Sequence, residues 1–143
     1  MKIKAGVIYA KSILVKSKRN LSWSFPIAVL VNMKLPSTVR FADEKIKEAF
    51  YKLEHGDDSE KELFKSINQS FDKIEENAFC GIRIPKDLIP NEYAKKYGVH
   101  NLWKYNLPKG WRLIYSIVAE KIIVVSLILE WFDHKEYERR FKY

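Results

Sequence analysis

The run Ile122–Phe132, with the sequence IIVVSLILEWF, constrains the fold of this chain more than any other stretch. It is almost continuously apolar, which is typical of a strand that is buried on both faces. Two β-rich runs precede it, Leu102–Leu107 and Trp111–Val118, and the short turns Pro108–Gly110 and Ala119–Lys121 separate the three. Proline and glycine between apolar runs indicate turns. The sequence therefore predicts a three-stranded meander whose last strand lies in the middle of a sheet.

Two amphipathic helices are predicted before this meander. Asp43 is a candidate N-cap of the first, and Ser59 with Glu62 forms a capping-box pattern for the second. Each helix has one apolar face, and only the sheet is large enough to cover both faces, so we expect a helical hairpin against the sheet. The apolar residues, spaced three and four apart, are Ile46, Ala49, Phe50 and Leu53 in the first helix, and Leu63, Ile67, Phe71 and Ile74 in the second.

Shorter elements complete the predicted fold. Ser37–Ala42 alternates in polarity and predicts a first strand, whereas Asn91–Tyr97 predicts a short helix that stops at Gly98. Gly81–Pro85 has an extended pattern, and His134–Phe141 predicts a short C-terminal helix. We therefore predict an α+β fold, in which a four-stranded, mainly antiparallel sheet packs against an N-terminal helical hairpin and carries a short C-terminal helix.

Length and composition bound the class of protein. The 143 residues are 47% hydrophobic and 14% aromatic, which excludes a disordered chain and allows one domain with a real core. The single Cys80 excludes a disulfide framework and cannot form a metal site alone, so a reducing, cytoplasmic location is expected. No run reaches the ~18 apolar residues that a membrane span needs.

Residues 1–32 differ in charge from the rest of the chain. They hold six basic residues and no acidic one, whereas the remainder holds 20 basic and 18 acidic residues, so the net charge of +8 belongs largely to this segment. The basic part is too long for a signal peptide, and a membrane-surface helix is an alternative that Pro26 would interrupt. We expect residues 1–32 to be an extension without a folded role, with Met33 as an alternative start, and residues 33–143 to form the domain.

Lys104, Lys109 and Arg112 form the first candidate site. Lys104 and Arg112 lie on adjacent predicted strands, and Lys109 lies in the turn between them. If the strands pair symmetrically about that turn, Lys104 and Arg112 are direct cross-strand neighbours, and two adjacent cations favour an anion such as a phosphate between them. The alternative is a solvated sheet face, on which carboxylates such as Glu130 pair with the two cations.

His134 and Tyr137 form the second candidate site, in the polar cluster directly after the meander. Spaced three apart, they share one face of a helix. There a histidine can transfer protons near neutral pH, and a tyrosine can stack on a base or assist acid–base chemistry. The alternative is a helix-capping histidine beside a tyrosine that packs in the core. Asp133, Glu136 and Glu138 would partly cancel the attraction for phosphate.

Three tryptophans and a set of absent motifs limit the possible chemistry further. Trp103, Trp111 and Trp131 can stack on nucleotides, but packing against the helices is the more frequent role of such residues. The sequence has no glycine-rich nucleotide motif, no P-loop, no HExxH and no pair of cysteines, and its three histidines are isolated from one another. We therefore expect neither a metal nor a small-molecule cofactor.

The order of helical hairpin, irregular linker, basic meander and polar C-terminal cluster resembles the RelE/ParE superfamily of toxins from bacterial and archaeal toxin–antitoxin pairs. The residues that carry the resemblance are Leu102–Tyr105 (LWKY), Gly110–Tyr115 (GWRLIY) and Glu130–Lys135 (EWFDHK). The likeness covers roughly residues 37–141 in layout, whereas its specific residues lie only in the meander and the polar cluster after it.

The resemblance implies a RelE-like mRNA interferase, an endoribonuclease that cuts mRNA on the ribosome and so inhibits translation, with the 2′-hydroxyl of the RNA as nucleophile. It matches Arg112 to the sheet arginine of the family, Lys104 and Lys109 to phosphate-contacting lysines, and His134 to the histidine of the C-terminal cluster. Tyr137 departs from the pattern, because the terminal tyrosine of the family commonly lies further from that histidine. The implied partners are a cognate antitoxin, the ribosome and mRNA, with no metal and no membrane. The alternative is a non-catalytic member of the same fold, either a ParE-like toxin directed at DNA gyrase or an inactive binding protein.

Overall fold

One mixed sheet organises the protein, whose computed structural model describes residues 34–120 and 123–142. The strand order is β1-β5-β4-β3-β2, in which β1 runs parallel to β5 and every other pair is antiparallel. The strand β5 therefore has a neighbour on each side, as its apolar sequence predicts. The bounds are β1 (Thr38–Phe41), β2 (Ile82–Arg83), β3 (Trp103–Asn106), β4 (Arg112–Glu120) and β5 (Ile123–Phe132).

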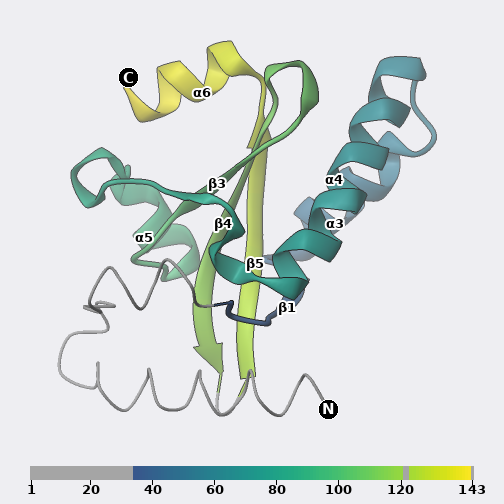
Figure 1. Ribbon diagram of the computed structural model, residues 1–143. Helices are drawn as coiled ribbons and strands as arrows, with labels where there is room; N and C mark the ends of the chain where they lie inside the picture. Colours follow the sequence, from purple (N-terminus) through teal and green to yellow (C-terminus); the bar gives the residue numbers. More distant parts are fainter. Residues whose placement is uncertain (1–33, 121–122, 143) are drawn as a thin grey trace, which may run out of the picture.

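A helical hairpin covers one face of this sheet, as the sequence predicts (Figure 1). Its helices are α3 (Glu44–Leu53) and α4 (Asp58–Glu76). Asp43 caps α3, because its side chain accepts a hydrogen bond of 2.8 Å from the backbone N–H of Ile46. The predicted apolar stripes face the sheet and form a first core with it. Its buried members include Phe50, Ile67, Ile74, Leu113, Tyr115 and Ile128.

The opposite face of the sheet carries the two shorter helices α5 (Asn91–Tyr97) and α6 (His134–Phe141), as Figure 1 shows. The helix α5 ends at Gly98, which has a left-handed φ of 67°. In the described part of the chain, the connections hold three 3-10 turns, η1 (Ala78–Cys80), η2 (Lys86–Leu88) and η3 (Pro108–Gly110). The second core, between these helices and the sheet, is formed by Ile84, Tyr93, Val99, Leu102, Ile114, Leu129, Phe132, Tyr137 and Phe141.

Three details of the predicted fold are wrong. The predicted turn Ala119–Lys121 is one, because Ala119 and Glu120 belong to β4 and pair with Val124 and Ile123. The sheet has five strands rather than four, because the extended segment at Ile82–Arg83 pairs with β3 at the edge. The capping box of α4 is formed by Asp57 and Glu60, which exchange hydrogen bonds of 2.9 Å with each other's backbone N–H, rather than by Ser59 and Glu62. The Asp57 pair comes first along the chain, so the helix begins before Ser59 is reached.

The predicted extension of residues 1–32 and the alternative start at Met33 lie outside the described residues. Within the ranges 34–120 and 123–142, no helix is long and apolar enough to cross a membrane.

Candidate functional site

Two cations and one aromatic ring meet where β3 and β4 pass beneath α6. The Nζ of Lys104 lies 4.8 Å from the centroid of the Tyr137 ring, and the guanidinium carbon of Arg112 lies 6.0 Å from the same centroid. Both cations are half-buried, whereas Tyr137 is only 3% exposed. A ring face attracts cations through its quadrupole. The Tyr137 ring therefore helps to hold two positive groups close together on one face of the sheet.

The register of the sheet explains how Lys104 and Arg112 come together. Lys104 pairs with Ile114, and Arg112 pairs with Asn106, so the predicted direct pairing of the two cations is wrong by two residues. The cause is the turn η3, across which the N–H of Leu107 donates to the carbonyl of Trp111 at 2.9 Å. A shift of two residues keeps side chains on the same face of a strand. Lys104 and Arg112 are therefore diagonal neighbours, and such positions on paired strands lie about 7–8 Å apart.

His134 lies at the same end of the sheet, at the first position of α6. The preceding Asp133 caps this helix by accepting a hydrogen bond of 2.8 Å from the N–H of Glu136. The His134 side chain is 59% exposed, and its Nε2 lies 3.1 Å from a carboxylate oxygen of Glu138. The turn η3 passes close by, because a Cβ built on Gly110 would lie 3.3 Å from the Cβ of His134. His134 is thus an accessible titratable group beside the start of β4.

The helix α6 presents its two candidate residues to different surroundings. His134 faces solvent, whereas Tyr137 packs in the second core with its ring centroid 4.9 Å from that of Phe141. Tyr137 therefore packs in the core, which is the alternative that the sequence left open for it. A buried ring can hold cations in place, but stacking on a base needs an exposed ring face.

Lys109 points away from Lys104 and Arg112. Its Nζ forms an ion pair of 2.5 Å with Glu62 of α4, on the hairpin side of the sheet. Lys109 has a φ of 59°, the left-handed conformation, which is part of the turn that sets this direction. The tryptophans also face the hairpin, because Trp103, Trp111 and Trp131 all pack against the first core. The expectation that they pack against the helices is therefore confirmed.

Two acidic residues near the candidate site, Glu130 and Glu136, have partners of their own. Glu130 of β5 accepts a hydrogen bond of 2.6 Å from the hydroxyl of Tyr93 in α5. Burial, followed by this hydrogen bond, raises the pKa of Tyr93 well above its ordinary value. On α6, the hydrogen bond from Arg139 lowers the pKa of Glu136 and favours its charged form. Glu130, which the alternative prediction pairs with Lys104 and Arg112, thus also forms a hydrogen bond with Tyr93 of α5.

Sequence reasoning missed the contacts that fix α6 over the sheet. Arg140 forms an ion pair with Glu92 of α5, and its guanidinium carbon lies 5.3 Å from the centroid of the Phe132 ring. Phe132 is in turn the cross-strand partner of Arg112. The sequence shows Arg140 about one turn after Tyr137. Its partner Glu92 lies 48 residues away, however, and only the tertiary fold brings the two together.

Comparison with known proteins identifies no relative. No protein-family model matches the chain, no curated protein matches it, and no solved structure matches it. Among the side chains of residues 34–120 and 123–142, no group of three or more His, Cys, Asp or Glu residues is arranged to hold a metal ion. The geometry around Lys104, Arg112 and His134 must therefore be interpreted through its own chemistry.

Proposed function

We propose that this protein is a RelE-like toxin of a toxin–antitoxin pair, an endoribonuclease that cuts mRNA on the ribosome and so inhibits translation. One observation carries the proposal. Lys104 and Arg112 converge on the ring of Tyr137, on a sheet face whose end is marked by the exposed His134. Convergent cations beside a titratable histidine suit a phosphodiester and the proton transfers of its cleavage.

The chemistry asks little of the protein, because RNA carries its own nucleophile. The 2′-hydroxyl attacks the adjacent phosphorus, a 2′,3′-cyclic phosphate forms, and the bond from phosphorus to the 5′-oxygen breaks. One proton leaves the 2′-oxygen and one is delivered to the 5′-oxygen. Arg112 and Lys104 would stabilise the charge on the phosphate oxygens, and His134 would move a proton, with Glu138 orienting the imidazole. Tyr137 would act by holding the two cations.

The architecture supports the same proposal at a coarser level. The helical hairpin, the linker through α5, the meander of β3, β4 and β5, and the helix α6 come in the order on which the resemblance to RelE/ParE toxins rests. Such a toxin implies a cognate antitoxin that covers the basic face until it is released. Fold likeness alone does not select the chemistry, so the proposal depends on the side chains.

A second candidate is a non-catalytic member of the same fold, a gyrase-directed toxin or an inactive binding protein. The burial of Tyr137 favours it, because a ring that is 3% exposed is poorly placed for stacking on RNA or for proton transfer. Glu138 favours it as well, since a carboxylate 3.1 Å from His134 weakens the attraction of that corner for phosphate.

Induced expression of the full chain in cells separates the two candidates. We expect growth arrest together with new mRNA 5′ ends, and loss of both in Arg112→Gln and His134→Ala, since removal of a general acid or base costs about 10²–10⁴-fold in rate. Arg40→Gln is the matched control, because Arg40 lies on β1 and pairs with Glu120 instead. It should arrest growth like the wild type. Arrest with intact mRNA would select the binding protein, and cleavage that survives Arg112→Gln would refute the assigned site.

A further inference from the structure

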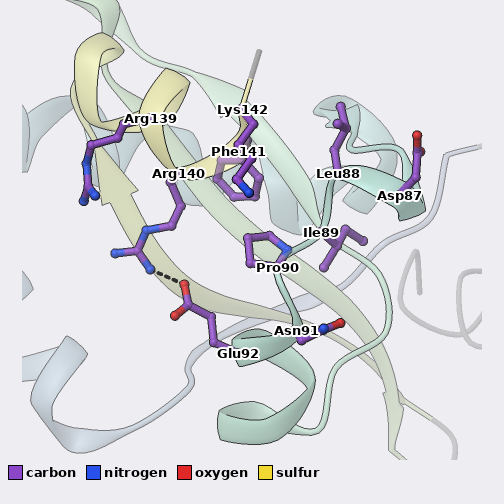
Figure 2. Close-up of a pocket in the computed structure, with 10 residues that line it drawn as sticks. All are labelled: Asp87, Leu88, Ile89, Pro90, Asn91, Glu92, Arg139, Arg140, Phe141 and Lys142. Carbon is purple, nitrogen blue, oxygen red and sulfur yellow. Dashed lines mark hydrogen bonds and ion pairs between the residues drawn. The ribbon is translucent and has the colours of Figure 1, made fainter.

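A pocket of about 760 Å³ lies beside the proposed site, between the C-terminal end of α6 and the segment that runs from η2 into α5 (Figure 2). This volume falls in the range of about 300–1,000 Å³ that is usual for pockets that hold small ligands. The lining residues come from two stretches that lie far apart in the sequence, Asp87–Glu92 and Arg139–Lys142. The tertiary fold therefore builds this pocket, and no local sequence motif indicates it.

The lining combines apolar surface with positive charge. Leu88, Ile89 and Pro90, which are half-buried, supply the accessible apolar part, whereas Phe141 is almost fully buried and lies beneath it. Arg139, Arg140 and Lys142 outnumber the two carboxylates of Asp87 and Glu92. Arg140 is paired with Glu92, and Arg139 is paired with Glu136 of α6, outside the lining. Figure 2 shows this ion pair at one side of the pocket, with Lys142 and Pro90 between it and Leu88. An anionic group that also has a flat apolar part fits such a lining.

A nucleotide has this chemistry, because it joins a phosphate to a base with an apolar face. Proteins that recognise single-stranded RNA take up unstacked bases on apolar side chains and on guanidinium planes, and they contact base edges with polar groups. The side chains of Asn91 and Glu92 line the pocket and offer donors and acceptors for a base edge. Lys142 offers positive charge for a flanking phosphate, and Arg140, which is paired with Glu92, offers its remaining N–H donors.

One side chain of β5, Phe132, links the pocket to the cationic pair on the sheet. Arg140 lines the pocket, and its guanidinium carbon lies 5.3 Å from the centroid of the Phe132 ring. Phe132 pairs directly with Arg112 across β4 and β5. Phe132 thus contacts an arginine that lines the pocket and is the cross-strand partner of the arginine that would hold the scissile phosphate.

We propose that this pocket binds one unstacked nucleotide of the RNA strand, next to the phosphate held by Lys104 and Arg112. The inference rests on the proposed function for the identity of the strand, and it adds a substrate subsite built by α5 and α6. It makes Arg140 and Lys142 binding residues, and it makes Asn91 and Glu92 the side chains that contact the base.

The test measures binding without cleavage. The probe is a fluorescein-labelled 2′-O-methyl RNA heptamer, whose blocked 2′-oxygen cannot attack, and fluorescence anisotropy with the full chain reports its affinity. Asn91→Trp fills the mouth of the pocket from an exposed position and removes no charge. We expect it to weaken binding about 10-fold or more, the size of a lost base-stacking contact. Circular dichroism verifies that each variant is folded.

A charge-matched pair of variants tests the phosphate contact. Lys142→Gln should weaken binding about 3-fold and reduce the salt slope of the logarithm of affinity by about 0.7, the change for one phosphate contact to a single strand. Lys52→Gln removes a lysine of α3 that is also exposed, on the hairpin side, and should change neither quantity. Equal losses in both variants would mean non-specific attraction and would overturn the pocket.

Arg112→Gln distinguishes failure of the pocket from failure of the proposed function. If both Arg112→Gln and Asn91→Trp weaken binding, the subsite and the cationic pair hold one strand together. If only Arg112→Gln weakens binding, the pocket is refuted and the proposed function stands. If only Asn91→Trp does so, the pocket binds nucleotides and the assignment of Arg112 fails. A wild-type protein that does not bind the heptamer at about 100 µM in low salt would overturn both.

Discussion

Replacement of Tyr115 by phenylalanine tests how the edge of the sheet is fixed. Tyr115 lies in β4 and is completely buried. Its hydroxyl donates a hydrogen bond of 2.7 Å to the carbonyl of Ala78 and accepts one of 3.1 Å from the N–H of Gly81. These two bonds tie the turn η1 and the start of β2 to a central strand. β2 then pairs with β3, where Ile82 lies opposite Lys104.

The loss of stability in Tyr115→Phe depends on the two backbone groups that lose their partner, the carbonyl of Ala78 and the N–H of Gly81. Phenylalanine keeps the ring and its packing, so the loss comes from two hydrogen bonds of about 1 kcal/mol each, with an added penalty for a buried carbonyl without a partner. Because Ala78 is fully buried, we expect a total loss of about 2–3 kcal/mol in the free energy of unfolding. For a domain of this size that corresponds to a fall in Tm of roughly 5–10 °C.

Urea unfolding followed by tryptophan fluorescence measures the Tyr115→Phe effect. Trp103 is a suitable reporter, since its ring centroid lies 6.4 Å from that of Tyr115. Tyr51→Phe is the matched control, because Tyr51 is 49% exposed and its change should stay within about 0.5 kcal/mol. Hydrogen exchange should speed up at the N–H of Gly81 in the Tyr115 variant. A loss below about 0.5 kcal/mol would refute the reasoning, since the two backbone groups would then have found other partners.

Three further predictions concern the fold and its dependence on pH. Tyr93 keeps its proton in the folded state above about pH 10, where the unfolded chain loses it, so stability should fall as pH rises from about 10 to 11, by up to about 1.4 kcal/mol per pH unit. In Tyr93→Phe the decline measured by urea unfolding should be shallower, and an equal slope would contradict the raised pKa. Gly98→Ala should cost only about 1 kcal/mol, because φ is 67° but nothing lies within 4 Å of the new Cβ. Gly81→Ala should cost clearly more, because its Cβ would lie 2.6 Å from the Tyr115 hydroxyl, and equal losses in urea unfolding would argue against this steric account. Asp57→Ala removes the capping box of α4 and should lower the Tm by about 3 °C in a thermal melt, a loss of about 1 kcal/mol, whereas an unchanged Tm would mean that the cap contributes nothing.

The elements that the sequence predicts well are those with a strong apolar pattern. The stripes of α3 and α4 lie on one face of each helix, and the run of β5 is buried on both faces of the sheet, so local periodicity is enough to find them. β2 gives no such signal, because it has two residues and both Ile82 and Arg83 are exposed. Its strand character comes from pairing with β3, which is a tertiary property.

The candidate site was predictable in composition but not in geometry. Alternation along β3 and β4 places Lys104 and Arg112 on one face, yet the exact register depends on the conformation of η3, where Lys109 takes a positive φ. The same turn directs Lys109 to Glu62, a contact that no spacing rule indicates. The burial of Tyr137 depends on how α6 lies on the sheet, and a helical spacing alone does not say which face is inward.

The parallel pairing of β1 with β5 has a consequence for the order of events during synthesis. β1 and the hairpin of α3 and α4 leave the ribosome first, but Thr38 pairs with Val125, about 87 residues later. At about 5–20 residues per second, translation needs roughly 4–17 s to make that partner, and the apolar face of the hairpin has no β4 or β5 to pack against in the meantime. Such long-range pairing slows folding as well. The complete sheet therefore cannot form until β5, its central strand next to β1, has been made.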